Sequence, residues 1–158
     1  MIEVGDKIPE YLGVTEEGAE LTREGLKGQK VILYFYPKDN TSGCTAQACS
    51  LRDGYSELRD AGYTVIGVSK DSAKSHQNFK AKYQLPFPLI TDSSTELNQA
   101  FGVWVEKSMY GRKYFGTQRT TFIIDEKGVV QAIVSGRQVD TKEHAAQLLK
   151  IINELEKE

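Results

Sequence analysis

The chain has 158 residues, a formal net charge of −2 at pH 7 and a hydrophobic content of 39%. This length predicts one domain over residues 1–158, with a core large enough to be stable without a disulfide. The charge argues against nucleic-acid-binding proteins and proteins of anionic membrane surfaces, because both usually carry a clustered excess of lysine and arginine.

The N-terminal sequence predicts neither export nor membrane insertion. The stretch MIEVGDKIPEYLG has no apolar region of the kind found in signal peptides. No apolar segment approaches the roughly 20 residues that a membrane helix needs. We therefore expect a cytoplasmic protein, whose thiols stay reduced.

Apolar runs and turn residues predict alternating strands and helices. Residues 1–30 are polar and punctuated by glycine, which is typical of short strands and turns. The run VILYFY at 31–36 predicts a strand buried on both faces. The other expected elements are a helix at 43–61, a strand at 63–69, a helix at 73–83, a strand at 88–91, a short helix at 94–101, a hairpin of 115–125 with 129–135, and a helix at 141–156. This order predicts an α/β fold with a central mixed sheet flanked by helices.

Three residues at two helix starts have side chains suited to capping. Ser72 is expected to cap the helix at 73–83, and Asp140 or Thr141 the last helix. These caps set the expected first residues of the two helices.

Both cysteines of the chain lie early in the expected helix 43–61, five positions apart. Cys44 shares a helix face with Ala48 and Leu51, and this face must pack on the sheet. Cys49 lies about 140° around the helix from Cys44. One thiol is therefore expected to point into the body of the protein and the other toward water.

The position of Cys44 predicts a reactive thiol. Free N–H groups in the first turn of a helix, together with the helix dipole, stabilise negative charge on sulfur. Asn40, Thr41 and Ser42 just upstream are good helix-capping residues. The site would also lie after the strand at 31–36, at the carboxyl end where α/β sheets place their ligands.

The spacing of the two cysteines predicts a conformational change if they form a disulfide. On an intact helix their Cα atoms would lie about 8.7 Å apart. A disulfide requires less than about 7 Å. The turn between Cys44 and Cys49 must therefore unwind before they can bond.

Two simpler interpretations of the cysteines were weighed. A lone cysteine most often packs in a core, although the helix-start position and the second cysteine make that interpretation weaker here. A zinc site is not expected, because Cys44, Cys49, His76 and His144 match no ligand spacing. We expect no metal and no other cofactor.

The motif PKDNTSGC at residues 37–44 fits the P-x-x-x-T-x-x-C signature of peroxiredoxins. With Cys49 five residues later, the chain resembles the bacterioferritin comigratory protein family, also called peroxiredoxin Q. The resemblance covers nearly the whole chain, including GDKIP, VIGVSKDS, FPLITD and YGRKYFGTQRTTFIID. It implies a thioredoxin-like fold of the peroxiredoxin type with an N-terminal extension. It also implies reduction of hydrogen peroxide and organic hydroperoxides.

The resemblance assigns roles to five residues. It implies that Cys44 is the peroxidatic cysteine and that Cys49 resolves the sulfenic acid as an intramolecular disulfide. It adds Pro37, Thr41 and Arg119 as further site residues. A thioredoxin-like dithiol would be the reductant. We expect a monomer, because both cysteines lie in one helix, and a dimer is the alternative left open.

One position departs from the motif, since many family members have proline where this chain has Ser42. Proline would fix φ at the helix entry, whereas serine can serve there as a cap. The loop is therefore expected to be less rigid, with the same chemistry.

Without the resemblance, the same residues have ordinary interpretations. Thr41 would be a helix cap, Arg119 a surface ion-pair residue and Pro37 the end of a strand. His76 is expected to be a half-buried helix residue. Two other functions also remain open: a thiol–disulfide exchange protein without peroxidase activity, and a non-enzymatic redox switch.

Overall fold

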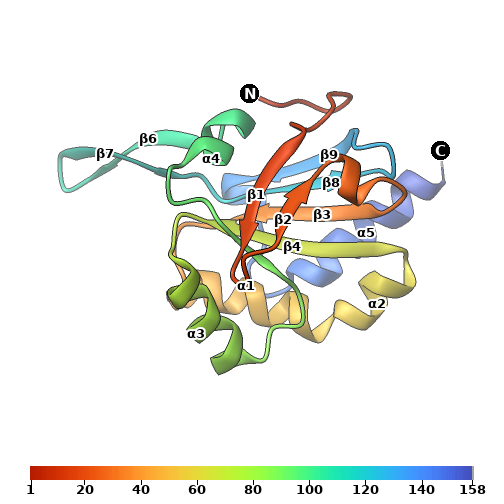
Figure 1. Ribbon diagram of the computed structural model, residues 1–158, viewed down its shortest axis with the longest axis horizontal. Coiled ribbons are helices and arrows are strands. Elements are labelled where there is room, and N and C mark those ends of the chain that lie inside the picture. The colour runs from red at the N-terminus through yellow and green to blue at the C-terminus, as the bar shows by residue number, and fades with distance from the viewer. Residues whose placement is uncertain (158) are drawn as a thin grey trace.

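The computed structural model describes residues 1–157, in which seven strands form one sheet and two form a separate hairpin (Figure 1). The strands are β1 (Tyr11–Thr15), β2 (Glu20–Thr22), β3 (Lys30–Phe35), β4 (Tyr63–Ser69), β5 (Leu89–Thr91), β6 (Trp104–Met109), β7 (Arg112–Thr117), β8 (Thr120–Ile124) and β9 (Val130–Ser135). The helices are α1 (Ser42–Asp53), α2 (Tyr55–Asp60), α3 (Ala73–Tyr83), α4 (Glu96–Phe101) and α5 (His144–Glu156), with 3₁₀ turns at Glu24–Leu26 and Gly136–Gln138. None of these described helices is both long and apolar enough to cross a membrane.

The main sheet is mixed, as the alternation of elements predicted. Its strand order is β2-β1-β5-β4-β3-β8-β9. The central strands β3, β4 and β5 run parallel to one another, and the outer pairings are antiparallel. This arrangement places the carboxyl ends of the parallel strands along one edge of the sheet.

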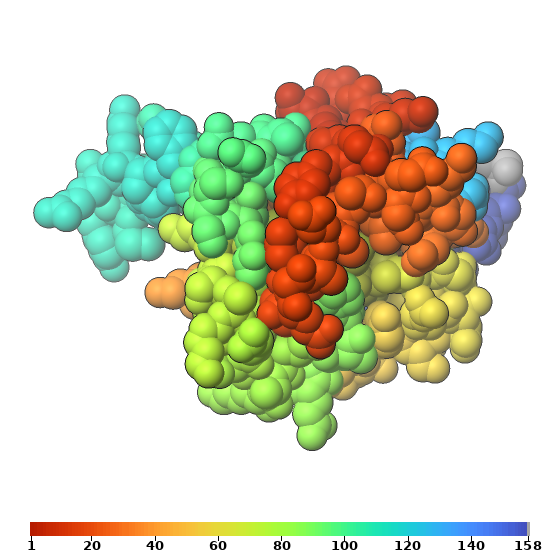
Figure 2. Space-filling view, in the orientation of Figure 1, coloured from red at the N-terminus to blue at the C-terminus, as the bar shows by residue number. Residues whose placement is uncertain are grey.

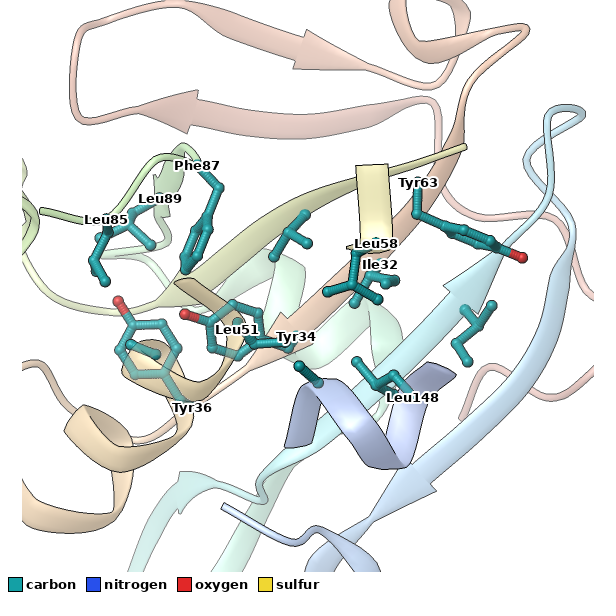
Figure 3. Packing of buried hydrophobic residues seen from close by; sticks show 14 of the residues in the cluster. Ile32, Tyr34, Tyr36, Leu51, Leu58, Tyr63, Leu85, Phe87, Leu89 and Leu148 are labelled. Carbon is teal, nitrogen blue, oxygen red and sulfur yellow. The ribbon is translucent and has the colours of Figure 1, made fainter. Parts of the chain in front are cut away.

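Strand β3 is buried on both faces, as its continuous apolar sequence predicted. Its alternate residues enter two different apolar clusters. One cluster lies under α1, α2, α3 and α5 and contains Tyr34, Leu51 and Leu148, which Figure 3 shows packed together. The other joins the opposite face of the sheet to α4 and the N-terminal segment. The core therefore holds α1, which carries both cysteines, firmly against β3.

The expected helix 43–61 is wrong in one respect, because Gly54 divides it into α1 and α2. The backbone at Gly54 has φ −94° and ψ 7°, outside the helical range. It also passes very close to α5: a Cβ atom on Gly54 would lie 2.5 Å from the Cβ of Ala145. This close approach leaves room only for glycine, and it lies at the break between α1 and α2. It cannot be predicted from the local sequence.

The expected strand 115–125 is also wrong, because it consists of two strands in different sheets. Strand β7 ends at Thr117 and pairs with β6 in a hairpin that projects from the body of the protein (Figures 1 and 2). Strand β8 begins at Thr120 and joins the main sheet between β3 and β9. Strand-forming residues run on through both segments, so only their pairing partners separate them. The expected hairpin with 129–135 is confirmed by the pairing of β8 with β9.

The expected caps are confirmed for one helix and wrong for another. The Ser72 hydroxyl accepts a hydrogen bond from the Ser75 N–H at 3.2 Å, so Ser72 caps α3. Helix α5 begins later than expected, and its N-cap, Glu143, makes no side-chain cap. Asp140 instead accepts a hydrogen bond from the Glu143 N–H, which stabilises the turn before the helix.

Candidate active site

Cys44 lies in the first turn of α1, directly after the loop that leaves the carboxyl end of β3. Its side chain is buried in the cluster under α1, with 1% of its surface exposed. Thr41 is the N-cap residue, and its carbonyl accepts the first helical hydrogen bond, from the Thr45 N–H at 2.8 Å. The sulfur of Cys44 therefore lies where free N–H groups and the helix dipole favour negative charge.

Arg119 reaches the same sulfur from the start of β8. One guanidinium nitrogen, Nη2, donates to Sγ of Cys44 at 3.4 Å, although 75 positions separate the two residues. The other nitrogen, Nη1, donates to Oε1 of Gln47 at 2.6 Å. The guanidinium is thus held at two points, with its positive charge directed at the thiol.

Gly43 makes room for this guanidinium. A Cβ atom at Gly43 would lie 3.1 Å from Nη2 of Arg119, closer than side chains ordinarily pack. Because Gly43 immediately precedes Cys44, this open space lies at the sulfur itself. The glycine of the sequence motif therefore has a spatial role in addition to its effect on the backbone.

Gln47 is a site residue that the sequence analysis missed. Its side chain is fully buried, and Nε2 has no hydrogen-bond partner within the described residues. It lies three positions after Cys44, so both side chains share one helix face. This helical spacing was the available signal, but only the position of Arg119 shows what Gln47 contacts.

Thr41 and Pro37 lie in the loop between β3 and α1. Thr41 is exposed, and its hydroxyl donates to the Lys38 carbonyl at 2.9 Å instead of accepting from a helix N–H. Thr41 is therefore at the cap position without being a side-chain cap. Pro37 is half-buried immediately after the strand run. Their place in the loop puts both near the start of α1, where the sequence motif places them.

Cys49 is half-buried further along α1, and both thiols are free. Helix α1 is continuous across the two cysteines. Beyond them, the Ser50 hydroxyl accepts from the Ala145 N–H at 3.1 Å and Arg52 donates to the Tyr83 carbonyl at 2.8 Å. The second half of α1 is therefore tied to α5 and α3 by hydrogen bonds. Among the described residues, no side-chain hydrogen bond ties the turn between the cysteines to these two helices.

Two further titratable groups lie near the thiol. The pKa of Lys107, on the projecting hairpin, is lowered by desolvation and by the nearby positive charge of Arg119. The pKa of Tyr34 is raised, chiefly by burial and then by negative charge on Cys44. The Tyr34 hydroxyl is buried without a hydrogen-bond partner among the described residues. The sequence analysis placed neither residue in the site.

Comparison with known proteins shows the family of the chain. The family model described as AhpC/TSA family matches residues 4–133. The chain belongs to the AhpC/TSA family. A Coxiella burnetii protein provisionally named peroxiredoxin bcp is 51% identical over 148 residues, covering 94% of this chain and 97% of its own. Peroxiredoxin Bcp of Bacillus subtilis is 39% identical, with coverage of 98% and 97%.

Solved structures confirm the predicted fold of this AhpC/TSA family member. Peroxiredoxin Q of Xanthomonas campestris superposes with a TM-score of 0.86 at 34% identity, covering 98% of this chain and 96% of that one. The resemblance to peroxiredoxin Q and the thioredoxin-like architecture are both confirmed. Another structure of the X. campestris bacterioferritin comigratory protein concerns its alkyl peroxide reduction activity.

Cysteine variants of the X. campestris protein are among the similar solved structures. Two of its solved variants each replace one cysteine, and these two positions lie much farther apart in its sequence than Cys44 and Cys49 do here.

Proposed function

We propose that Cys44 is the peroxidatic cysteine of this thiol-dependent peroxidase. The observation that carries the proposal is the 3.4 Å contact between Nη2 of Arg119 and Sγ of Cys44, made at the N-terminal turn of α1. A fixed cation and free helix N–H groups stabilise the thiolate, which is the nucleophilic form of cysteine. Membership of a peroxiredoxin family supports peroxide as the electrophile.

The first step is attack of the Cys44 thiolate on one oxygen of hydrogen peroxide or an organic hydroperoxide. An S–O bond forms as the O–O bond breaks, giving a sulfenic acid, and the departing oxygen takes a proton and leaves as water or alcohol. Arg119 stabilises the charge that develops on this oxygen. The Thr41 hydroxyl and first-turn N–H groups align the peroxide, and Pro37 shields the sulfur from bulk water.

The second step is attack of the Cys49 thiolate on the sulfur of the sulfenic acid, which releases water and forms a disulfide. Because an intact helix holds their Cα atoms about 8.7 Å apart, the turn between them unwinds first. The ties of Ser50 to α5 and Arg52 to α3 hold the rest of α1 in place. A dithiol then reduces the disulfide and regenerates both thiols.

The peroxiredoxin family works with thioredoxin-like reductants, and we propose that a cytoplasmic thioredoxin is the reductant here. We also propose that residues 1–158 form one domain and act as a monomer. Both cysteines belong to the same helix of one chain, so resolution requires no second subunit.

Peroxide consumption with thioredoxin and its reductase tests the proposal. The unmodified protein should turn over continuously, and Cys44→Ser should be inactive. Cys49→Ser should consume about one equivalent of peroxide and then stop. Continued turnover by Cys49→Ser with thioredoxin would show that Cys49 is not needed for resolution. Absence of peroxide consumption by the unmodified protein would contradict the assignment of Cys44 and favour a thiol-exchange protein or a redox switch.

A further inference from the structure

A buried carboxyl–imidazole pair lies beside the loop that leads to Cys44. The side chains of Asp39, in this loop, and His76, on α3, are both buried. Nδ1 of His76 lies 2.7 Å from Oδ2 of Asp39, and Nε2 lies 2.9 Å from the Ile90 carbonyl. His76 is therefore fully buried, which corrects the expectation of a half-buried residue. It connects the loop to β5 through one rigid ring.

Both nitrogens of the His76 ring have hydrogen-bond partners, which fix the ring in two directions. Asp39 accepts two further hydrogen bonds, from the Tyr36 hydroxyl at 2.6 Å and the Ser75 hydroxyl at 2.8 Å. Four hydrogen-bond contacts therefore hold the two side chains in place.

The same cluster also contains Asp71, whose carboxylate lies close enough for the three side chains to resemble a metal site. However, Oδ2 of Asp71 accepts from the Asp39 N–H at 2.8 Å and from the Ser69 hydroxyl at 2.6 Å. The ring nitrogens of His76 are already occupied as described above. These side chains therefore satisfy one another, and their common effect is to fix the backbone of Asp39.

The residue after Asp39 shows that the loop is held in an unusual shape. Asn40 has φ 63°, a left-handed conformation that is uncommon outside glycine. Its side-chain oxygen accepts from the Tyr83 hydroxyl at 3.2 Å. Helix α3 thus contacts the loop at both ends, through His76 near its start and Tyr83 at its end. Thr41 follows at once, so the position of Thr41 depends on these contacts.

We propose that His76 is a positioning residue for the peroxidase reaction: paired with Asp39, it holds loop 37–41 in the shape that presents Thr41 and the first turn of α1 to the peroxide. This inference rests on the proposed role of Cys44. The same contacts hold the chain in place before the turn that unwinds, as the hydrogen bonds of Ser50 and Arg52 hold it in place after that turn. The released segment is then the one that contains both cysteines.

The test separates the two chemical steps. In a Cys49→Ser background, where oxidation stops at the sulfenic acid, His76→Gln should lower the second-order rate constant for peroxide about tenfold, since an amide cannot reproduce both hydrogen-bond contacts of the ring. With Cys49 present, the rate of disulfide formation in His76→Gln should stay the same or rise, because a looser loop unwinds more readily. Amide hydrogen exchange should accelerate at residues 38–44 and not in α5.

His144→Gln is the matched control, because His144 is the other fully buried histidine and its ring contacts Thr121 and Gln147 instead of the loop. It should leave the peroxide rate constant within twofold of the parent value. Ser75→Ala is a milder variant that removes one donor to Asp39 and should lower the rate constant two- to threefold. If His76→Gln does not fold, the peroxide rate constant of Ser75→Ala tests the positioning role instead.

Unchanged peroxide rate constants in both His76→Gln and Ser75→Ala would overturn the positioning role. Equal slowing of peroxide reduction and of disulfide formation in His76→Gln would overturn it as well. Failure of the proposed function is recognised separately, because the Cys49→Ser parent itself would then not form one equivalent of sulfenic acid. If the Cys49→Ser parent forms one equivalent of sulfenic acid, and His76→Gln and Ser75→Ala react with peroxide as fast as the parent, only the role of His76 is contradicted.

Discussion

Arg119 contacts Cys44 across 75 positions of sequence, with Nη2 3.4 Å from Sγ. Helix α1 and strand β8 meet at this contact, and both pack against β3. Gln47 holds the other arm of the guanidinium at 2.6 Å. The charge beside the sulfur is therefore fixed by the tertiary structure and not by a flexible side chain reaching through solvent.

Replacement of Arg119 should slow the first chemical step. Arg119→Lys keeps the positive charge but loses the planar fork that contacts Gln47 and Cys44 together, so we expect roughly a tenfold lower second-order rate constant for peroxide. Arg119→Ala should cost about a hundredfold, in the range found for loss of one donor to a transition-state charge. Stopped-flow measurement of Cys44 oxidation checks both values.

Arg137→Ala, in an exposed 3₁₀ turn, is the matched arginine control and should react like the unmodified protein. Alkylation of Cys44 by iodoacetamide at pH 7 should slow in the Arg119 variants in the same order as peroxide oxidation. Equal rates in Arg119→Ala and Arg137→Ala would show that the contact has no part in the reaction.

Gly43→Ala should separate stability from activity. Alanine in a helix is favoured over glycine by about 1 kcal/mol, so the free energy of unfolding should stay level or increase. The new methyl group would lie 3.1 Å from Nη2 of Arg119 and should displace the guanidinium from the sulfur. We expect a severalfold lower peroxide rate in a protein that is no less stable, measured by urea unfolding and stopped-flow oxidation. A variant with full activity would mean that Arg119 adjusts freely.

His144 should make the protein less stable in mild acid. Its ring is buried between Thr121 and Gln147, and desolvation lowers its pKa from 6.5 to about 4. Between these pH values the unfolded chain binds a proton that the folded protein does not. The free energy of unfolding should therefore fall as the pH drops from 6.5 toward 4, by up to about 3 kcal/mol.

Urea unfolding at several pH values measures this loss. His144→Gln should remove the contribution of His144 to the pH dependence of the free energy of unfolding. The contributions of other titratable groups should stay the same. An identical pH dependence in the variant and the unmodified protein would show that His144 is not the group responsible.

Gly54→Ala tests the contact between the α1–α2 junction and α5. The added Cβ would lie 2.5 Å from the Cβ of Ala145, so the two helices must move apart. We expect a loss of about 1–3 kcal/mol in the free energy of unfolding. Gly116→Ala is the matched control, since its Cβ would make contacts of 3.4 Å and longer, and it should change stability by less than about 0.5 kcal/mol. Equal stability of the two variants would contradict the packing argument.

The predicted elements were most accurate where the apolar pattern of a segment matches one type of element. The run at 31–36 predicted a strand buried on both faces, and β3 is that strand. The face that Cys44 shares with Ala48 and Leu51 is buried, as helical spacing required. The hairpin of β6 with β7 was not predicted, because β7 and β8 are almost continuous in sequence and only pairing separates them.

Local sequence was enough to predict three features: the motif from Pro37 to Cys44, the place of Cys44 at the start of a helix after a buried strand, and the spacing of Cys49 that requires unwinding. These follow from local geometry, because helix and strand periods fix which neighbours share a face. The tertiary structure was needed to show that Arg119 contacts both the sulfur of Cys44 and the side chain of Gln47, and that His76 holds Asp39. Such contacts join residues tens of positions apart, and their distances depend on how β3, α1, α3 and β8 pack together, which no local period encodes.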